Sequence, residues 1–181
     1  MKRLLHTLRE SEDGQAVVEL ALALPVLLIV VLGIVDFGRA VNYWNDENHL
    51  ANIGARYAAV DSWPEECVEK EPGSKEQTIS KPTLVQYLKC QASIDSTELT
   101  AGGGANGVQN GITVCVSLPT SKLEVGQPVS VSVSAPYKWL PYPKVLGGTF
   151  SFATSTLTGT ATMRLERVPP SESELTKGSS C

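Results

Sequence analysis

One apolar segment near the N-terminus constrains this chain more than any other feature. Residues 16–35 contain a single charged side chain, Glu19, and no polar face after Leu20. A helix rises ~1.5 Å per residue, so this segment is ~30 Å long, which matches the hydrocarbon core of a bilayer. A buried helix of a soluble protein normally keeps a polar face. The sequence therefore predicts one transmembrane helix, which we place at residues 15–35.

The charges that flank this segment predict its orientation. Lys2, Arg3 and Arg9 precede it, whereas only Arg39 follows within about fifteen residues. The positive-inside rule then places the N-terminus in the cytoplasm and the residues after about position 36 outside it. A removed secretory signal is the rival interpretation, but the apolar run is too long for it, and the candidate cleavage site at residues 38–40 has Arg in the middle.

Two residues are unusual in a simple membrane anchor. A charge such as that of Glu19 costs ~2.5–3.5 kcal/mol at mid-bilayer and less near the interface. Glu19 could reach the headgroups, or it could need a cationic partner from another chain, and its local context favours the second interpretation. Pro25 has no N–H, so the carbonyl of Ala21 loses its helical donor and we expect a kink.

That local context is the sequence of residues 13–19, DGQAVVE, in which Gly14 ends a short charged leader and Glu19 is the fifth residue after it. This pattern resembles a type IV prepilin cleavage site. The resemblance implies that a prepilin peptidase cuts after Gly14. Gln15 would then carry a new α-amino group one helical turn from Glu19, and in assembled pili this amine usually pairs with the Glu of a neighbouring subunit.

A larger part of the segment resembles the TadE-like pseudopilins of tight-adherence (Flp-type) pilus systems. The matching positions are Gly14, Glu19, Ala21, Pro25, Gly33, Phe37, Gly38 and Gly54-Ala55-Arg56. Leu20 replaces the Tyr of major Flp pilins, which are also much shorter, and both departures favour a minor pseudopilin. The resemblance implies a bacterial inner-membrane protein. Its implied partners are prepilin peptidase, other pilin or pseudopilin subunits, the inner-membrane pilus assembly machinery and membrane lipid.

Beyond the membrane we expect a stalk helix over residues 36–60, an extracytoplasmic α+β domain over residues 61–167 and a flexible C-terminal tail over residues 168–181. Residues 1–14 form the cytoplasmic leader. Two stripes at helical spacing mark the stalk. One runs through Phe37, Val41, Trp44, Asn48, Ala51, Ala55 and Ala58 and suits close approach by a helix of this or another chain; the other runs through Leu50, Ile53, Tyr57 and Val60 and suits packing on the chain's own sheet. Pro64 ends the helix.

The rest of the outer domain combines a loop, a short helix and three strands. Residues 61–81 are charged and contain Pro and Gly, which indicates a loop, and a short helix begins at Pro82. The glycine-rich residues 101–107 lack the GK[ST] ending of a phosphate cradle. Alternation predicts strands at residues 112–118, 129–135 and 150–167. Residues 136–143, rich in Pro and aromatics, cannot form a central strand and either cover the sheet or contact another subunit.

The four cysteines, Cys67, Cys90, Cys115 and Cys181, all lie in the region predicted to be outside the cytoplasm, where disulfides persist. Four cysteines allow three connectivities. We favour Cys67–Cys90, which joins the loop after the stalk to the short helix, while Cys115–Cys181 would hold the tail on the sheet. We expect no metal site, because His49 is the only histidine of the outer region.

Together these features predict an α+β, pilin-like fold in which a long N-terminal helix packs on a small antiparallel sheet. The leading function is a minor pseudopilin of a Tad/Flp-type pilus. The alternative is an unprocessed, single-pass membrane-anchored binding module. An enzyme is disfavoured, because the outer region has one His and no HExxH motif, and we expect no cofactor. The net charge of −4 argues against nucleic acid as a partner.

Overall fold

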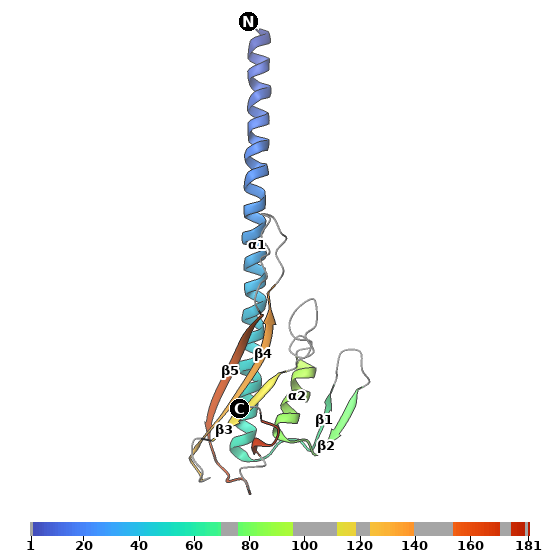
Figure 1. Ribbon diagram of the computed structural model, residues 1–181, viewed down its shortest axis with the longest axis vertical. Coiled ribbons are helices and arrows are strands. Elements are labelled where there is room, and N and C mark those ends of the chain that lie inside the picture. The colour runs from blue at the N-terminus through green and yellow to red at the C-terminus, as the bar shows by residue number, and fades with distance from the viewer. Residues whose placement is uncertain are drawn as a thin grey trace. The chain divides into compact units, whose positions relative to one another are not determined.

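The computed structural model describes residues 2–69, 76–95, 112–118, 124–139, 154–170, 175–179 and 181, without the side chains of residues 2–13, 69 and 95. The chain forms two compact units, Met1–Arg39 and Ala40–Cys181. The first helix contributes residues to both units. The second unit holds the described strands and the second helix (Figure 1).

The long helix α1 runs from Lys2 to Val60 and remains helical through Pro25. It ends where Asp61 adopts left-handed backbone with a φ of 50°, and there the amide of Ser62 donates to the carbonyl oxygen of Tyr57 at 3.3 Å. This bond defines a Schellman motif, which satisfies a carbonyl that the last turn leaves without a partner. The helix therefore ends at the residue where the sequence places the end of the stalk.

Three antiparallel strands form the main sheet in the order β3-β4-β5, with bounds Thr113–Ser117, Pro128–Lys138 and Thr154–Arg164. Val131 of β4 lies opposite Val116 of β3 and Ala161 of β5. Every second side chain of β4 is buried, as expected for a sheet with one covered face. The buried side chains are Val129, Val131, Val133, Ala135 and Tyr137.

The part of α1 that belongs to the second unit, residues 40–60, covers the buried face of this sheet. Ala51, Ala55 and Ala58 are fully buried, and the amide of Glu166, just after β5, donates to the carbonyl oxygen of Ala59 at 2.8 Å. Helix and sheet can approach closely because the residues at the contact are small. The prediction of an α+β fold with a long helix packed on a small antiparallel sheet is confirmed.

The first stripe of the stalk divides along its length. Its alanines are buried by the chain's own sheet, whereas Trp44 remains 52% exposed and Val41 45% exposed. In the second stripe Leu50 is buried and Tyr57 is half-buried, and the ring of Tyr57 packs edge-on against Tyr87 at 5.3 Å.

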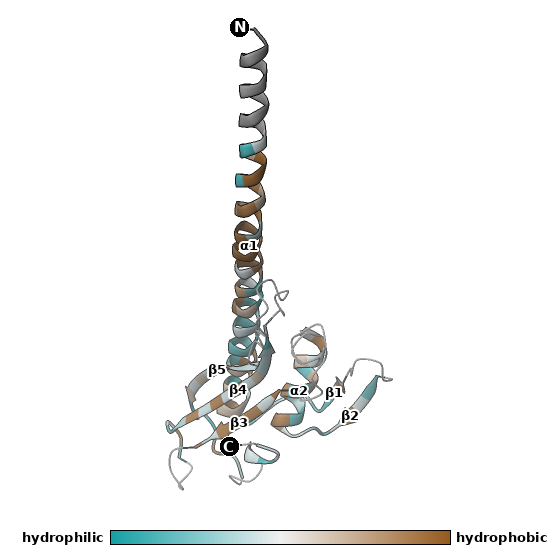
Figure 2. Ribbon diagram, turned by 45° about the horizontal axis from the view of Figure 1, so that its top comes forward, coloured by the Kyte–Doolittle hydropathy of each residue, from teal (hydrophilic) through white to brown (hydrophobic). Residues whose placement is uncertain are grey.

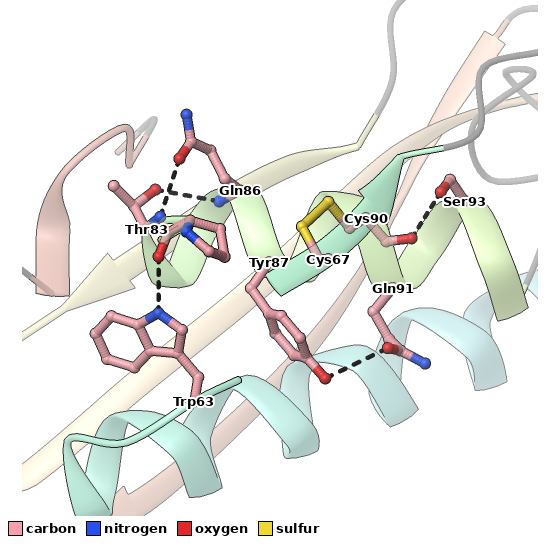
Figure 3. Close-up of a disulfide and its surroundings, with 9 residues drawn as sticks. Trp63, Cys67, Thr83, Gln86, Tyr87, Cys90, Gln91 and Ser93 are labelled. Carbon is pink, nitrogen blue, oxygen red and sulfur yellow. Dashed lines mark hydrogen bonds between the residues drawn. A yellow bond between two sulfur atoms is a disulfide. The ribbon is translucent and has the colours of Figure 1, made fainter. Parts of the chain in front are cut away.

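The unit Ala40–Cys181 is called the outer unit from this point, because it follows the apolar segment. A hairpin and the short helix α2 form its second part. Strands β1 (Glu66–Glu69) and β2 (Gln77–Ser80) pair antiparallel, and the disulfide Cys67–Cys90 joins β1 to α2 (Leu84–Asp95; Figure 3). Thr83 caps α2: its Oγ1 accepts from the amide of Gln86 at 3.2 Å, and Gln86 Oε1 accepts from the amide of Thr83 at 2.9 Å. The helix thus begins after Thr83 and not at Pro82.

Two further predictions for the outer unit are wrong. Residues 61–81 do not form only a loop, because they contain both strands of the hairpin. Pro136 lies inside β4, where the sequence excludes a central strand. The pairing of β3 with β4 stops at Ser134, so β4 has only β5 beside it at Pro136, and a missing N–H is tolerated there. Residues 101–107, 140–143, Phe150 and Phe152 lie outside the described residues.

Candidate functional site

The candidate site lies in the first unit, where Gly14 precedes the apolar part of α1. Gly14 is exposed, and a Cβ atom built on it would meet nothing within 4 Å. Glycine inside a helix lowers helix stability by roughly 1 kcal/mol relative to alanine. No described side chain therefore shields the peptide bond after Gly14, and the helix is easier to unwind there than at the residues that follow.

The next residue, Gln15, is linked to the carboxylate of Glu19. Gln15 Nε2 donates to Glu19 Oε1 at 3.2 Å, across one turn of the helix, and both side chains are exposed. This neighbour is a neutral amide, so the described contact leaves the negative charge of Glu19 without a compensating positive charge.

The helix surface after Glu19 is apolar on every side, and none of the described parts of the chain covers it. The large hydrophobic residues from Leu20 to Val35 are between 38% and 72% exposed. This is the part of α1 that Figure 2 shows in the hydrophobic colour. It belongs to the one described helix that is long and apolar enough to cross a membrane. An uncovered apolar surface of this size requires lipid or other helices around it.

A second carboxyl, that of Glu47, lies on the other half of α1. Its side chain is fully buried, and Oε1 accepts a hydrogen bond from the backbone amide of Ala135 at 3.1 Å, while Oε2 has no hydrogen-bond partner among the described residues. The strand β5 is adjacent at Gly159, where a Cβ atom would lie 2.7 Å from the carbonyl oxygen of Glu47 and closer still to the amide nitrogen of Asn48. Helix and strand backbones therefore touch beside this carboxyl.

Burial changes the acidity of Glu47. Loss of hydration raises the pKa of this carboxyl from 4.5 to about 7, the hydrogen bond from Ala135 opposes this change, and the nearby charge of Asp46 adds to it. A fully buried carboxyl with one unpartnered oxygen favours its neutral form. Glu47 is thus a proton-binding group of the outer unit.

Comparison with known proteins gives one match. Residues 14–56 match the family model of TadE-like proteins. The N-terminal segment is TadE-like. This TadE-like segment includes Glu19 and Glu47, and the resemblance seen in the sequence is confirmed over it. No curated protein and no solved structure matches the chain.

The structure places the residues singled out in the sequence in two separate places. Gly14, Gln15, Glu19 and Pro25 follow one another along the TadE-like segment, and their proposed roles stay predictions. In the outer unit the cysteines form two disulfides, Cys67–Cys90 and Cys115–Cys181, which are the pairs considered from the sequence. Within the described ranges, no group of His, Cys, Asp and Glu side chains could hold a metal ion.

Glu47 is the residue that the sequence analysis missed. It stands four residues after Tyr43 and three before Leu50, and both of these side chains are buried. An acidic residue at helical spacing between large apolar residues is the available signal. The predicted stripe through Trp44 and Asn48 includes the residue after Glu47 but not Glu47 itself.

Proposed function

We propose that this protein is a minor pseudopilin of a Tad-type pilus, cut after Gly14 by a prepilin peptidase and acting in pilus assembly. One observation carries the proposal: a single helix combines an open glycine, a carboxylate five residues later and an apolar surface that the chain does not cover. The TadE-like match over residues 14–56 supports involvement in a Tad pilus.

Cleavage is the first step of the proposed mechanism. With the leader in the cytoplasm and the helix in the inner membrane, the bond after Gly14 lies at the cytoplasmic face. Gly14 offers the peptidase no side chain to avoid, and its low helix propensity permits local unwinding. Hydrolysis leaves Gln15 with a free α-amino group at the start of an apolar helix.

Assembly is the second step, and Glu19 sets its register. When the helix leaves lipid and packs among other helices, an unpaired carboxylate would be costly in the apolar filament core. The α-amino group of a neighbouring subunit's first residue supplies the opposite charge. In the free chain the neutral side-chain amide of Gln15 donates a hydrogen bond to the Glu19 carboxylate. This exposed hydrogen bond can be exchanged for a bond from the charged α-amino group of the neighbouring subunit. Pro25, which cannot complete the helical hydrogen bonds, is the position where we expect the helix to bend during transfer.

The outer unit has a structural role in this proposal. It lies outside the cytoplasm, where its two disulfides can form and persist. It contributes no proposed catalytic group, since Glu47 is buried below the sheet and has no access to a substrate.

The mature N-terminus tests the proposal. The full chain is produced in cells with and without the prepilin peptidase, purified from the membrane, and weighed by intact-mass spectrometry. We expect loss of 14 of the 181 residues only in cells that make the peptidase. A chain that still begins at Met1 in those cells would contradict processing and favour a membrane-anchored binding module that is never assembled.

A further inference from the structure

The C-terminal residues pass around the free edge of the sheet, next to β3. Leu175 is fully buried in the core. A turn follows, in which the amide of Ser179 donates to the carbonyl oxygen of Thr176 at 2.8 Å and Gly178 has a φ of 84°. A Cβ atom on Gly178 would lie 3.8 Å from Val85 of α2. The chain therefore leaves the core between α2 and the edge of β3.

The last described residues cover the backbone of β3 at Val116. Ser179 Oγ accepts from the amide of Val116 at 2.9 Å, and Cys181 Sγ lies 3.6 Å from the carbonyl oxygen of Val116. Because a disulfide sulfur carries no proton, the Ser179 hydroxyl is the donor in its 3.2 Å contact with Cys181 Sγ. Both backbone groups of Val116 that face away from β4 are thus covered by side chains of the C-terminal residues.

The disulfide Cys115–Cys181 holds the last residue of this segment on the other face of the sheet. Cys115 is half-exposed and alternates with the buried Val114 and Val116, so its side chain projects to the outer face of the sheet. Its bond to Cys181 joins Cα atoms 5.0 Å apart. The segment that starts at Leu175 on the inner face consequently ends on the outer face, after passing around the edge.

A strand edge without such cover is a template for another strand. Strand β3, with the sequence TVCVS, has no charged residue and no proline to oppose pairing. A second copy presents the same uncharged edge, and two identical edges can pair antiparallel about a two-fold axis. We propose that Leu175, Gly178, Ser179 and Cys181 form a strap that blocks the β3 edge. When a dithiol reductant converts Cys115–Cys181 to two thiols and is itself oxidised to a disulfide, the strap is released and this edge binds the β3 edge of a second copy.

The test compares full-length chains in detergent micelles. The double variant C115S/C181S removes the lock of the strap without leaving a free thiol, and C67S/C90S is the matched control, since it also loses one disulfide but leaves the strap in place. The oligomeric state is measured by light scattering after size exclusion over a range of concentrations. We expect the dimer dissociation constant of C115S/C181S to fall by about tenfold or more relative to wild type and to the control.

A third variant separates strand pairing from general unfolding. Thr113 is exposed at the end of β3, and T113K in the C115S/C181S background places a charge on the edge strand, which opposes pairing with another strand. We expect it to restore the monomer while the circular dichroism spectrum stays unchanged. Persistent association of the triple variant, or a monomeric C115S/C181S chain, would overturn the proposal. Amide exchange at Val116 gives a second measurement: it should be slow in wild type and fast in the variants under conditions where they are monomeric, and equal rates would also overturn it.

Discussion

The buried carboxyl of Glu47 makes the stability of the outer unit depend on pH. Its folded-state pKa, about 7, lies above the ordinary value of 4.5, so between these values the folded chain binds a proton that the unfolded chain has lost. Stability therefore falls as pH rises through this window, and the loss is complete above about pH 7. Among the described neighbours, Asp46 adds negative charge, while Ala135 and Gly159 contribute only backbone groups.

The magnitude follows from the size of the shift. One pKa unit corresponds to 1.36 kcal/mol, so a rise from 4.5 to about 7 costs the folded state on the order of 3 kcal/mol once the carboxyl is ionised. About 2.5 kcal/mol of this loss falls between pH 5 and pH 8. For a unit of this size that is a decrease of about 10 °C in the melting temperature.

The substitution Glu47→Gln isolates this effect. The amide keeps an oxygen to accept from Ala135 and replaces the unpartnered oxygen by an uncharged group, so the shape of the site is retained. We compare the free energy of unfolding of the variant with that of wild type at each pH. We expect the variant's advantage to be about 2 to 3 kcal/mol larger at pH 8 than at pH 5. Asp46→Asn is the control, because it removes a neighbouring charge but leaves the buried carboxyl, so most of the pH dependence should remain.

Unfolding of the full-length chain in micelles can be followed by the fluorescence of Trp63 and Trp139, which are half-buried in the outer unit. Urea titrations at intervals between pH 5 and pH 8 give the free energy of unfolding for wild type and both variants. Parallel pH profiles for wild type and Glu47→Gln would refute the reasoning, since the carboxyl would then titrate alike in the folded and unfolded chains.

Three further predictions concern the helix α1 and the strand β5 that packs on it. Gly14→Leu should abolish removal of the leader, and a normal mature mass in this variant would mean that cleavage occurs elsewhere. Glu19→Ala should insert into the membrane at least as well as wild type but be recovered from sheared pili at a severalfold lower level, and equal recovery would remove its role in register. Gly159→Ala should lower stability by about 1–3 kcal/mol, because its Cβ would meet the backbone of Glu47 and Asn48. Gly54→Ala should cost less, because its Cβ would meet only side-chain methyl groups, those of Leu88 and Val131, and equal losses would argue against a rigid backbone contact at Gly159.

The sequence predicts well those features that depend on local pattern. The apolar run, the helix end at Val60 and the alternation in residues 129–135 each arise from neighbouring residues along the chain. The disulfide pairs could be ranked because the compartment and the neighbouring elements restrict which cysteines meet. These features needed no knowledge of how distant segments pack.

Features that depend on distant segments were missed. The hairpin of β1 and β2 has short strands of mostly polar residues, so its pattern does not differ from that of a loop. Its link to α2 through Cys67–Cys90 is a tertiary contact. Pro136 is acceptable in β4 only because β3 ends before it. The burial of Glu47 likewise depends on strands that follow it by about ninety residues.

Glu19 and Glu47 show that the two halves of α1 have different surroundings. Around Glu19 the apolar surface is uncovered within the chain, so its partners must come from outside; around Glu47 the chain's own sheet covers the helix. The outer unit buries its core with residues of its own chain, and in the proposed function this folding step precedes assembly with other subunits. Substitutions should therefore separate the two steps: Glu47→Gln should change the pH dependence of unfolding and leave removal of the leader intact. Glu19→Ala should change incorporation into pili and leave the unfolding of the outer unit unaltered.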